Sequence, residues 1–134
     1  MARTVDNNGI GALYGTFDID TTNGDYDLTS DDEGCAVALS ASNEADKGSD
    51  GGILLGRLEN VKDGIATVQI AGVVRLDVDT GKTAPVVGNR VVINGAGKVY
   101  QAPALTGDDP AGGNVAKGLV IAVDSTNHTC DVLL

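Results

Sequence analysis

Large side chains are scarce in this sequence. Its 134 residues include one Phe, three Tyr, one Met and no Trp, whereas Gly occupies 19 positions. An acidic chain with so few aromatic residues resembles a disordered one, but 42% of its residues are hydrophobic, which indicates a folded chain. The length fits one domain, and we expect its core to consist of small branched side chains.

Basic residues are also few. Nine Lys and Arg face 19 Asp and Glu, which gives a net charge of −10. A nucleic-acid partner needs clustered Lys and Arg to neutralise phosphates, and an anionic membrane surface needs the same. The longest aliphatic stretch, residues 119–123, is too short to cross a bilayer. We therefore expect neither nucleic acid nor a membrane as a partner.

Cysteine and histidine offer little chemistry. Cys35 and Cys130 lie 95 positions apart, so neither belongs to a CxxC redox or zinc pattern. Residues 1–8 contain no apolar run of the kind that signal peptides have, so we expect two reduced thiols and assembly in the cytoplasm. The only histidine, His128, falls in an expected turn, where a general base is not expected. The sequence predicts no enzyme and no catalytic residue.

Two stretches imitate known binding loops and fail in detail. Gly81-Lys82-Thr83 ends like a phosphate-binding loop, but Leu76 stands where the first glycine is required and Pro85 favours extended chain. Residues 18–29 imitate an EF-hand loop without its Gly at position six and its Glu at position twelve. We expect no cofactor and no metal, although an irregular Ca²⁺ site remains open. Its ligands would come from Asp25, Asp27, Asp31, Asp32 and Glu33.

The negative charge is concentrated early in the chain. Residues 18–50 hold ten acidic residues and one Lys, a net charge of −9, whereas residues 51–134 hold eight acidic and seven basic residues. We interpret the early segment as solvated loops that keep the protein soluble. A functional acidic surface is the alternative.

Strand patterns dominate from residue 52 onward. Val74, Leu76 and Val78 alternate with polar residues, as in a half-buried strand. Asn94-Gly95-Ala96-Gly97 separates two short apolar runs, residues 90–93 and 98–101, which predicts a hairpin. Further strands are expected at residues 10–19, 35–39, 53–58, 65–70, 119–123 and 130–134. In the strand at 119–123 we expect Leu119, Ile121 and Val123 to share one face. In the last strand we expect the same of Cys130, Val132 and Leu134. Residues 43–52 read as an exposed loop.

These patterns predict an all-β fold. We expect a small β-barrel or β-sandwich of short, mostly antiparallel strands, with an extended N-terminal arm and long acidic loops. Residues 1–17 form the arm or a first strand, and residues 18–134 form one β domain. Within that domain, residues 18–52 are acidic and loop-rich and residues 53–134 form the β core.

The order of motifs in residues 64–134 resembles the capsid cement, or decoration, proteins of tailed bacteriophages. The motifs are the strand of residues 66–70 with the following Gly72-Val73, Val87-Gly88-Asn89-Arg90-Val91, Gly97-Lys98-Val99, Gly118-Leu119-Val120 and the valine-containing end Cys130–Leu134. The resemblance covers about half of the chain and leaves residues 1–63 outside. It implies a non-enzymatic virion protein on the outside of a phage head. Such a protein would bind the major capsid protein, and itself as a homotrimer, and stabilise the shell.

Residues 1–17 are the candidate attachment segment. They are neutral and carry the apolar residues Val5, Ile10, Leu13, Tyr14 and Phe17, which we expect to contact the capsid or a neighbouring subunit by strand pairing. An ordinary first strand of the domain explains residues 10–17 equally well.

The alternative function is a small β-type surface module that binds a glycan or Ca²⁺, although glycan sites usually depend on aromatic residues that are scarce here.

Overall fold

The computed structural model describes residues 5–104, 107 and 116–134. This part of the chain contains ten β-strands, one short 3₁₀ turn and no α-helix, so the predicted all-β fold is confirmed. The elements are β1 (Leu13–Ile19), η1 (Ser30–Asp32), β2 (Ala36–Ala41), β3 (Glu44–Asp46), β4 (Gly56–Lys62), β5 (Ile65–Ala71), β6 (Val73–Asp77), β7 (Val91–Ile93), β8 (Val99–Gln101), β9 (Leu119–Asp124) and β10 (Thr129–Leu133). In these ranges no helix has the length and apolar character needed to span a membrane.

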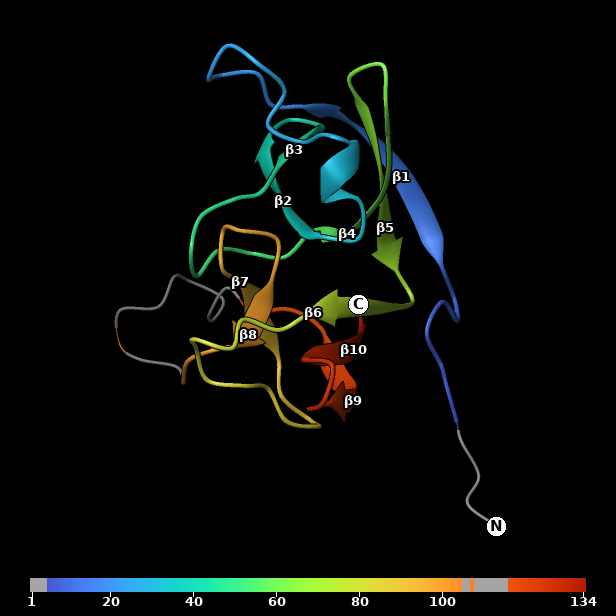
Figure 1. Ribbon diagram of the computed structural model, residues 1–134, viewed down its shortest axis with the longest axis vertical. Helices are drawn as coiled ribbons and strands as arrows, with labels where there is room; N and C mark the ends of the chain where they lie inside the picture. The colour runs from blue at the N-terminus through green and yellow to red at the C-terminus, as the bar shows by residue number, and fades with distance from the viewer. Residues whose placement is uncertain (1–4, 105–106, 108–115) are drawn as a thin grey trace.

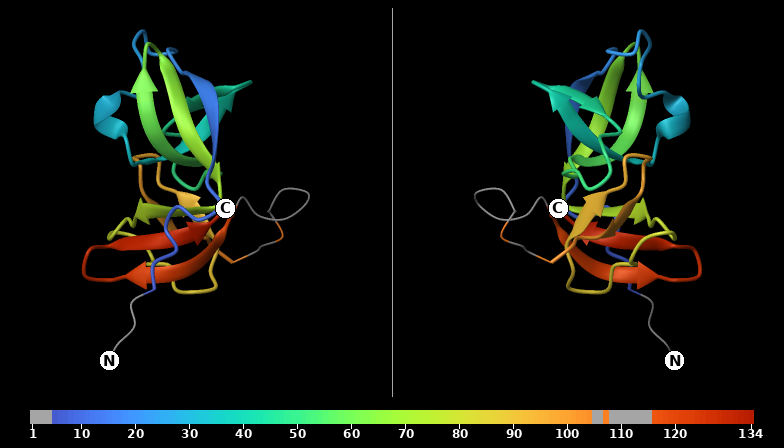
Figure 2. Two further views of the ribbon diagram at one scale, coloured as in Figure 1. Left: turned by 90° about the vertical axis from the view of Figure 1, so that its right-hand side faces the viewer. Right: turned by 90° about the vertical axis from the view of Figure 1, so that its left-hand side faces the viewer.

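Strands β1 to β5 close a small barrel in the order β1-β3-β2-β4-β5 (Figures 1 and 2). β1 runs parallel to β3, and the other neighbouring strands are antiparallel. The sequence predicted residues 43–52 as a loop, and this prediction is wrong at β3. Three residues, Glu-Ala-Asp, show no alternation long enough to identify a strand, and β3 forms because β1 and β2 offer it pairing on both sides.

Small aliphatic side chains fill the barrel. Its core comprises Ile19, Leu28, Val37, Ala45, Leu58, Ala66 and Val68. β4 and β5 approach each other so closely that a Cβ atom at Gly56 would overlap the carbonyl oxygen of Gln69. Only glycine therefore fits at position 56, and in the described part of the chain the one aromatic residue packed against this core is the half-buried Phe17.

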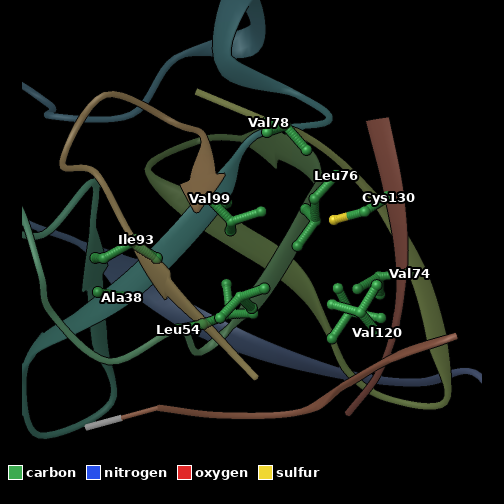
Figure 3. Packing of buried hydrophobic residues seen from close by; sticks show 12 residues of the cluster. Ala38, Leu54, Val74, Leu76, Val78, Ile93, Val99, Val120 and Cys130 are labelled. Atoms are coloured by element: carbon green, nitrogen blue, oxygen red, sulfur yellow. The ribbon is translucent and has the colours of Figure 1, made fainter. Parts of the chain in front are cut away.

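A second core lies below the barrel in Figure 1, between the sheet β6-β10-β9 and the hairpin β7-β8. β2 belongs to both cores, because Val37 faces the barrel interior while Ala36 and Ala38 pack into the second core. Figure 3 shows Ala38 beside Ile93, and Cys130 pointing towards Leu76. The remaining members of the second core are Leu54, Val74, Val78, Val91, Val99, Val120 and Val132.

Several predicted strands are found where the sequence placed them. Val74, Leu76 and Val78 are all buried, and so are Cys130 and Val132. The hairpin β7-β8 pairs Val91 with Gln101 and Ile93 with Val99.

The prediction that Leu119, Ile121 and Val123 share one face of β9 is wrong. Val120 is the buried residue, whereas Leu119 and Val123 are each more than two-fifths exposed. The pairing of β9 with β10 shifts by one residue between Asp131 and Val132, and this irregularity breaks the alternation on which the prediction depended.

Candidate functional site

The five predicted contact residues fall into two groups. Val5, Ile10, Leu13 and Tyr14 are exposed, by 53–71% of their surface. Phe17, by contrast, is half-buried and packs against the barrel core. Residues 13–17 belong to β1, where an ordinary first strand explains them, and only the residues before Leu13 run outside the barrel. We call residues 5–12 the arm.

The arm is attached to the edge of β6 at one point. The Gly9 N–H donates to the Val73 carbonyl at 2.9 Å, and the Val73 N–H donates to the Ile10 carbonyl at 2.9 Å. Gly9 adopts a positive φ of 86°, a conformation that glycine permits at low cost. The chain therefore turns sharply at Gly9. The residues before Gly9, towards the N-terminal end of the arm, leave the edge of β6.

An ion pair is the second contact between the arm and the sheet. The Arg75 guanidinium binds both carboxylate oxygens of Asp131, at 2.8 and 3.1 Å, and also contacts the Asp6 carboxylate at 3.1 Å. Asp131 is buried, while Asp6 is exposed. These contacts raise the pKa of Arg75 further above its ordinary value, chiefly through the hydrogen bonds to Asp131. The Arg75–Asp131 pair is therefore a fixed part of the sheet, and Asp6 is the exchangeable partner.

Exposed aliphatic side chains gather where the arm meets the sheet. Ile10 neighbours Val73, Val73 pairs with Leu133, and Leu133 pairs with Leu119, so these four positions form a row. Val73 is buried within this row, and the other three residues are exposed. Leu119 and Leu133 are 44% and 43% exposed. Alternation in the sequence placed Leu119 on one face with Ile121 and Val123, so no signal there identified this row. We call Val5, Ile10, Leu13, Leu119 and Leu133 the arm flank.

Charge is segregated between the two halves of the molecule. The barrel, residues 13–71, contains twelve acidic and three basic residues, a net charge of −9. Residues 72–134 contain six acidic and five basic residues, a net charge of −1. One half is thus strongly anionic, and the half that carries the arm flank is nearly neutral.

The acidic segment does not assemble a metal site in the part of the chain that the structure describes, where no group of three or more His, Cys, Asp or Glu side chains is placed to hold an ion. Three of the candidate carboxylates serve local structure instead. Asp27 accepts the Lys47 N–H at 3.1 Å, Glu33 accepts the Val61 N–H at 3.0 Å, and Asp32 accepts the Thr29 N–H at 2.9 Å.

A cleft of about 630 Å³ opens between β2, the segment 48–55 and β7. We call it the waist cleft; its lining includes Leu39, Asp46, Ile53, Ile93 and Lys117.

The charged side chains of the waist cleft have shifted pKa values. The Lys117 ammonium donates to the Leu55 carbonyl at 3.0 Å, and burial lowers the pKa of Lys117. Burial likewise raises the pKa of Asp46, whereas hydrogen bonds from Thr22 lower the pKa of Asp20 at the same rim. Sequence patterns gave no indication of this cleft, because its residues come from distant segments.

The remaining reactive side chains are not brought together. Cys35 and Cys130 are both free thiols, as predicted, and burial raises the pKa of Cys130 to about 12. His128 lies in the turn between β9 and β10, as predicted, with a positive φ of 55°.

Comparison with known proteins adds no relative. No family model matches the sequence, and a search of curated proteins gives no significant match.

Proposed function

We propose that this protein is a structural component of a phage virion, a capsid cement protein that binds the outer surface of the head and stabilises contacts between major capsid proteins. The proposal begins from the resemblance of residues 64–134 to that family. The structure supports it by one observation above all, the segregation of net charge between the two halves of the molecule.

The segregation suits a protein that sits on a shell with one side in solvent. The barrel carries a net charge of −9, which favours hydration. The other half has a net charge of −1 and bears exposed aliphatic residues, including Val86 and Val87 at 60% and 65% exposure. Their segment, residues 79–89 (yellow to gold in Figure 1), lies at the end of the molecule far from the barrel. We infer that this end faces the shell and that the barrel projects outward.

Association as a homotrimer would strengthen such binding. Each copy presents a modest surface, and a trimer at a threefold position engages three such surfaces together, so the second and third contacts form at high effective concentration. The partners proposed are thus the major capsid protein and further copies of this chain.

Co-sedimentation with phage heads tests the proposal. Purified protein is added to expanded heads that lack it, with unexpanded proheads as the control, and the bound copies are counted. We expect saturable binding to expanded heads in multiples of three per site. Absence of binding by folded protein would contradict the proposal for that shell.

A truncation tests the part played by the arm. Deleting residues 2–9 removes the Asp6 and Gly9 contacts but leaves β1 intact. We expect weaker head binding with an unchanged far-ultraviolet circular dichroism spectrum. Undiminished affinity for heads would show that the arm takes no part in attachment.

A further inference from the structure

The waist cleft contains an open strand edge. β2 pairs with β4 only at Ala36–Arg57 and Val37–Gly56, and the Leu55 N–H donates to the Val37 carbonyl at 2.8 Å. Peptide groups of a strand face its two edges alternately, so those of Leu39 face the same edge as those of Val37. Among the described residues, no backbone group bonds Leu39 at that edge. An extended segment fits this edge by strand addition.

The side chains around this edge define the segment that suits it. Leu39 and Ile53 are 55% and 57% exposed beside the cleft, so they offer an apolar contact. The half-buried Lys117 ammonium has one hydrogen bond, to the Leu55 carbonyl, among the described residues, which leaves N–H groups for a carboxylate. Asp20 and Asp46 also line the cleft, so a strongly anionic ligand is disfavoured and a nearly neutral strand with one carboxylate is favoured.

The arm has these properties. Val5 is 71% exposed, and Asp6 follows it with a carboxylate that is 56% exposed. Within residues 5–7 the only bonded backbone group among the described residues is the Asn7 carbonyl, which accepts the Ile10 N–H. Release from Arg75 costs Asp6 little, because Arg75 keeps both of its bonds to Asp131.

The arm and the cleft lie on opposite flanks. In Figure 1 the arm descends on the right, whereas β2, β3 and the loop that follows them lie on the left, and the two side views of Figure 2 agree. An extended chain spans about 3.3 Å per residue, so residues 5–8, which precede the anchored Gly9, reach roughly 13 Å beyond it. The arm therefore points towards a neighbouring molecule rather than its own cleft.

We propose that residues 5–7 of each copy add a strand to β2 in the waist cleft of the next copy, with Val5 against Leu39 and Ile53 and with Asp6 paired to Lys117. Donor and acceptor surfaces differ, so the contact is heterologous, and a threefold rotation between successive copies closes it into a ring of three. This inference rests on the proposed function, in which the protein acts as a trimer. It assigns Val5 to the subunit interface and leaves the end formed by residues 79–89 to the shell.

Disulfide cross-linking between two single-cysteine additions tests the contact. Val5→Cys protein is mixed with Ile53→Cys protein, free in concentrated solution and bound to heads, and oxidised before non-reducing electrophoresis. The matched control replaces Ile53→Cys with Tyr26→Cys, because Tyr26 is similarly exposed at 51% and lies on the acidic segment. Each variant oxidised alone reports the background from Cys35 and Cys130.

We expect covalent dimers in the Val5–Ile53 mixture and not in the Val5–Tyr26 mixture. Equal yields in the two mixtures, or no dimers either free or on heads, would overturn the inference. Head binding of wild-type protein is measured separately, so a failure of the cement function remains distinguishable from a failure of the arm contact.

Substitution of the cleft lysine gives a second measurement. We expect Lys117→Met to weaken self-association at least about fivefold in sedimentation equilibrium, as loss of an ion pair of about 1 kcal/mol does. Lys98→Met, which removes the same charge from the exposed end of the hairpin, should leave self-association unchanged. Equal effects of the two substitutions would show that only net charge matters and would contradict the assigned pairing.

Discussion

Arg75 is the residue on which the nearly neutral half depends most. It neutralises Asp131, which is buried with 5% of its surface exposed. We expect Arg75→Met to lower the free energy of unfolding by about 3 kcal/mol, because the Asp131 carboxylate would remain buried without its partner. Urea denaturation measures this change.

A matched substitution separates this effect from the loss of any surface ion pair. Lys82 pairs with Asp50 at 3.1 Å, and its side chain is 41% exposed, close to the 42% of Arg75. We expect Lys82→Met to lower the free energy of unfolding much less than Arg75→Met does, because both partners of this pair stay hydrated. Similar losses for the two variants would show that burial of Asp131 is not the cause.

Cys130 makes stability depend on pH in the alkaline range. Burial raises its pKa from 9.0 to about 12, so between these values the unfolded chain loses the thiol proton and the folded chain keeps it. The contribution of this thiol is therefore fully present below pH 9 and is lost as the pH rises towards 12. Relative to Cys130→Ala, the wild-type free energy of unfolding should fall by an additional ~1.4 kcal/mol per pH unit in that window.

Chemical denaturation at several pH values measures the difference between the two proteins. Cys130→Ala is expected to be less stable at pH 7, because it leaves a cavity, but its alkaline slope should be shallower. Parallel pH profiles would contradict this account of Cys130.

At the scale of elements, the hairpin β7-β8 shows what local sequence determines. The Asn94 side chain accepts the Ala96 and Lys98 N–H groups at 2.8 and 3.0 Å and donates to Asp79 at 2.9 Å. We expect Asn94→Ala to lower the free energy of unfolding by about 1–2 kcal/mol, because these backbone groups lose their partner. Thermal unfolding measures the loss, and Ala96→Ser at an exposed position of the same turn is the control.

The sequence could predict this hairpin because its turn and both strands lie within twelve residues. It could not predict β3, whose pairing with β1 joins Asp18 to Glu44, nor the exposure of Leu119, because the pairing of β9 with β10 skips Ile121. The candidate site likewise has one part that the sequence could predict and one part that it could not. The arm is visible as a neutral apolar segment, whereas the waist cleft brings Leu39 and Lys117 together only through the tertiary fold.

For the whole molecule, net charge would set the conditions of the proposed assembly. In the proposed trimer three barrels of net charge −9 would repel one another, and salt would screen that repulsion. We expect self-association to strengthen between about 20 mM and 300 mM NaCl, where the Debye length falls from roughly 20 Å to below 10 Å. Sedimentation velocity at several protein concentrations measures the shift.

A control variant identifies the barrel as the source of the repulsion. Asp31→Asn, at an exposed position, and Glu44→Gln, at a partly buried one, together remove two barrel charges and should make association less salt-dependent. Association that weakens with added salt would instead show that attraction between opposite charges dominates the interface.

The order of strands along the chain also sets an order of folding during synthesis. The five barrel strands are contiguous, so the barrel has all of its strands once residue 71 has left the ribosome. The sheet β6-β10-β9 has its last strand, β10, at the centre, so it stays incomplete until residue 133 emerges. Each nascent chain therefore completes its anionic half first and completes last the half that we propose binds the shell, so the proposed binding surface is not assembled until synthesis is nearly finished.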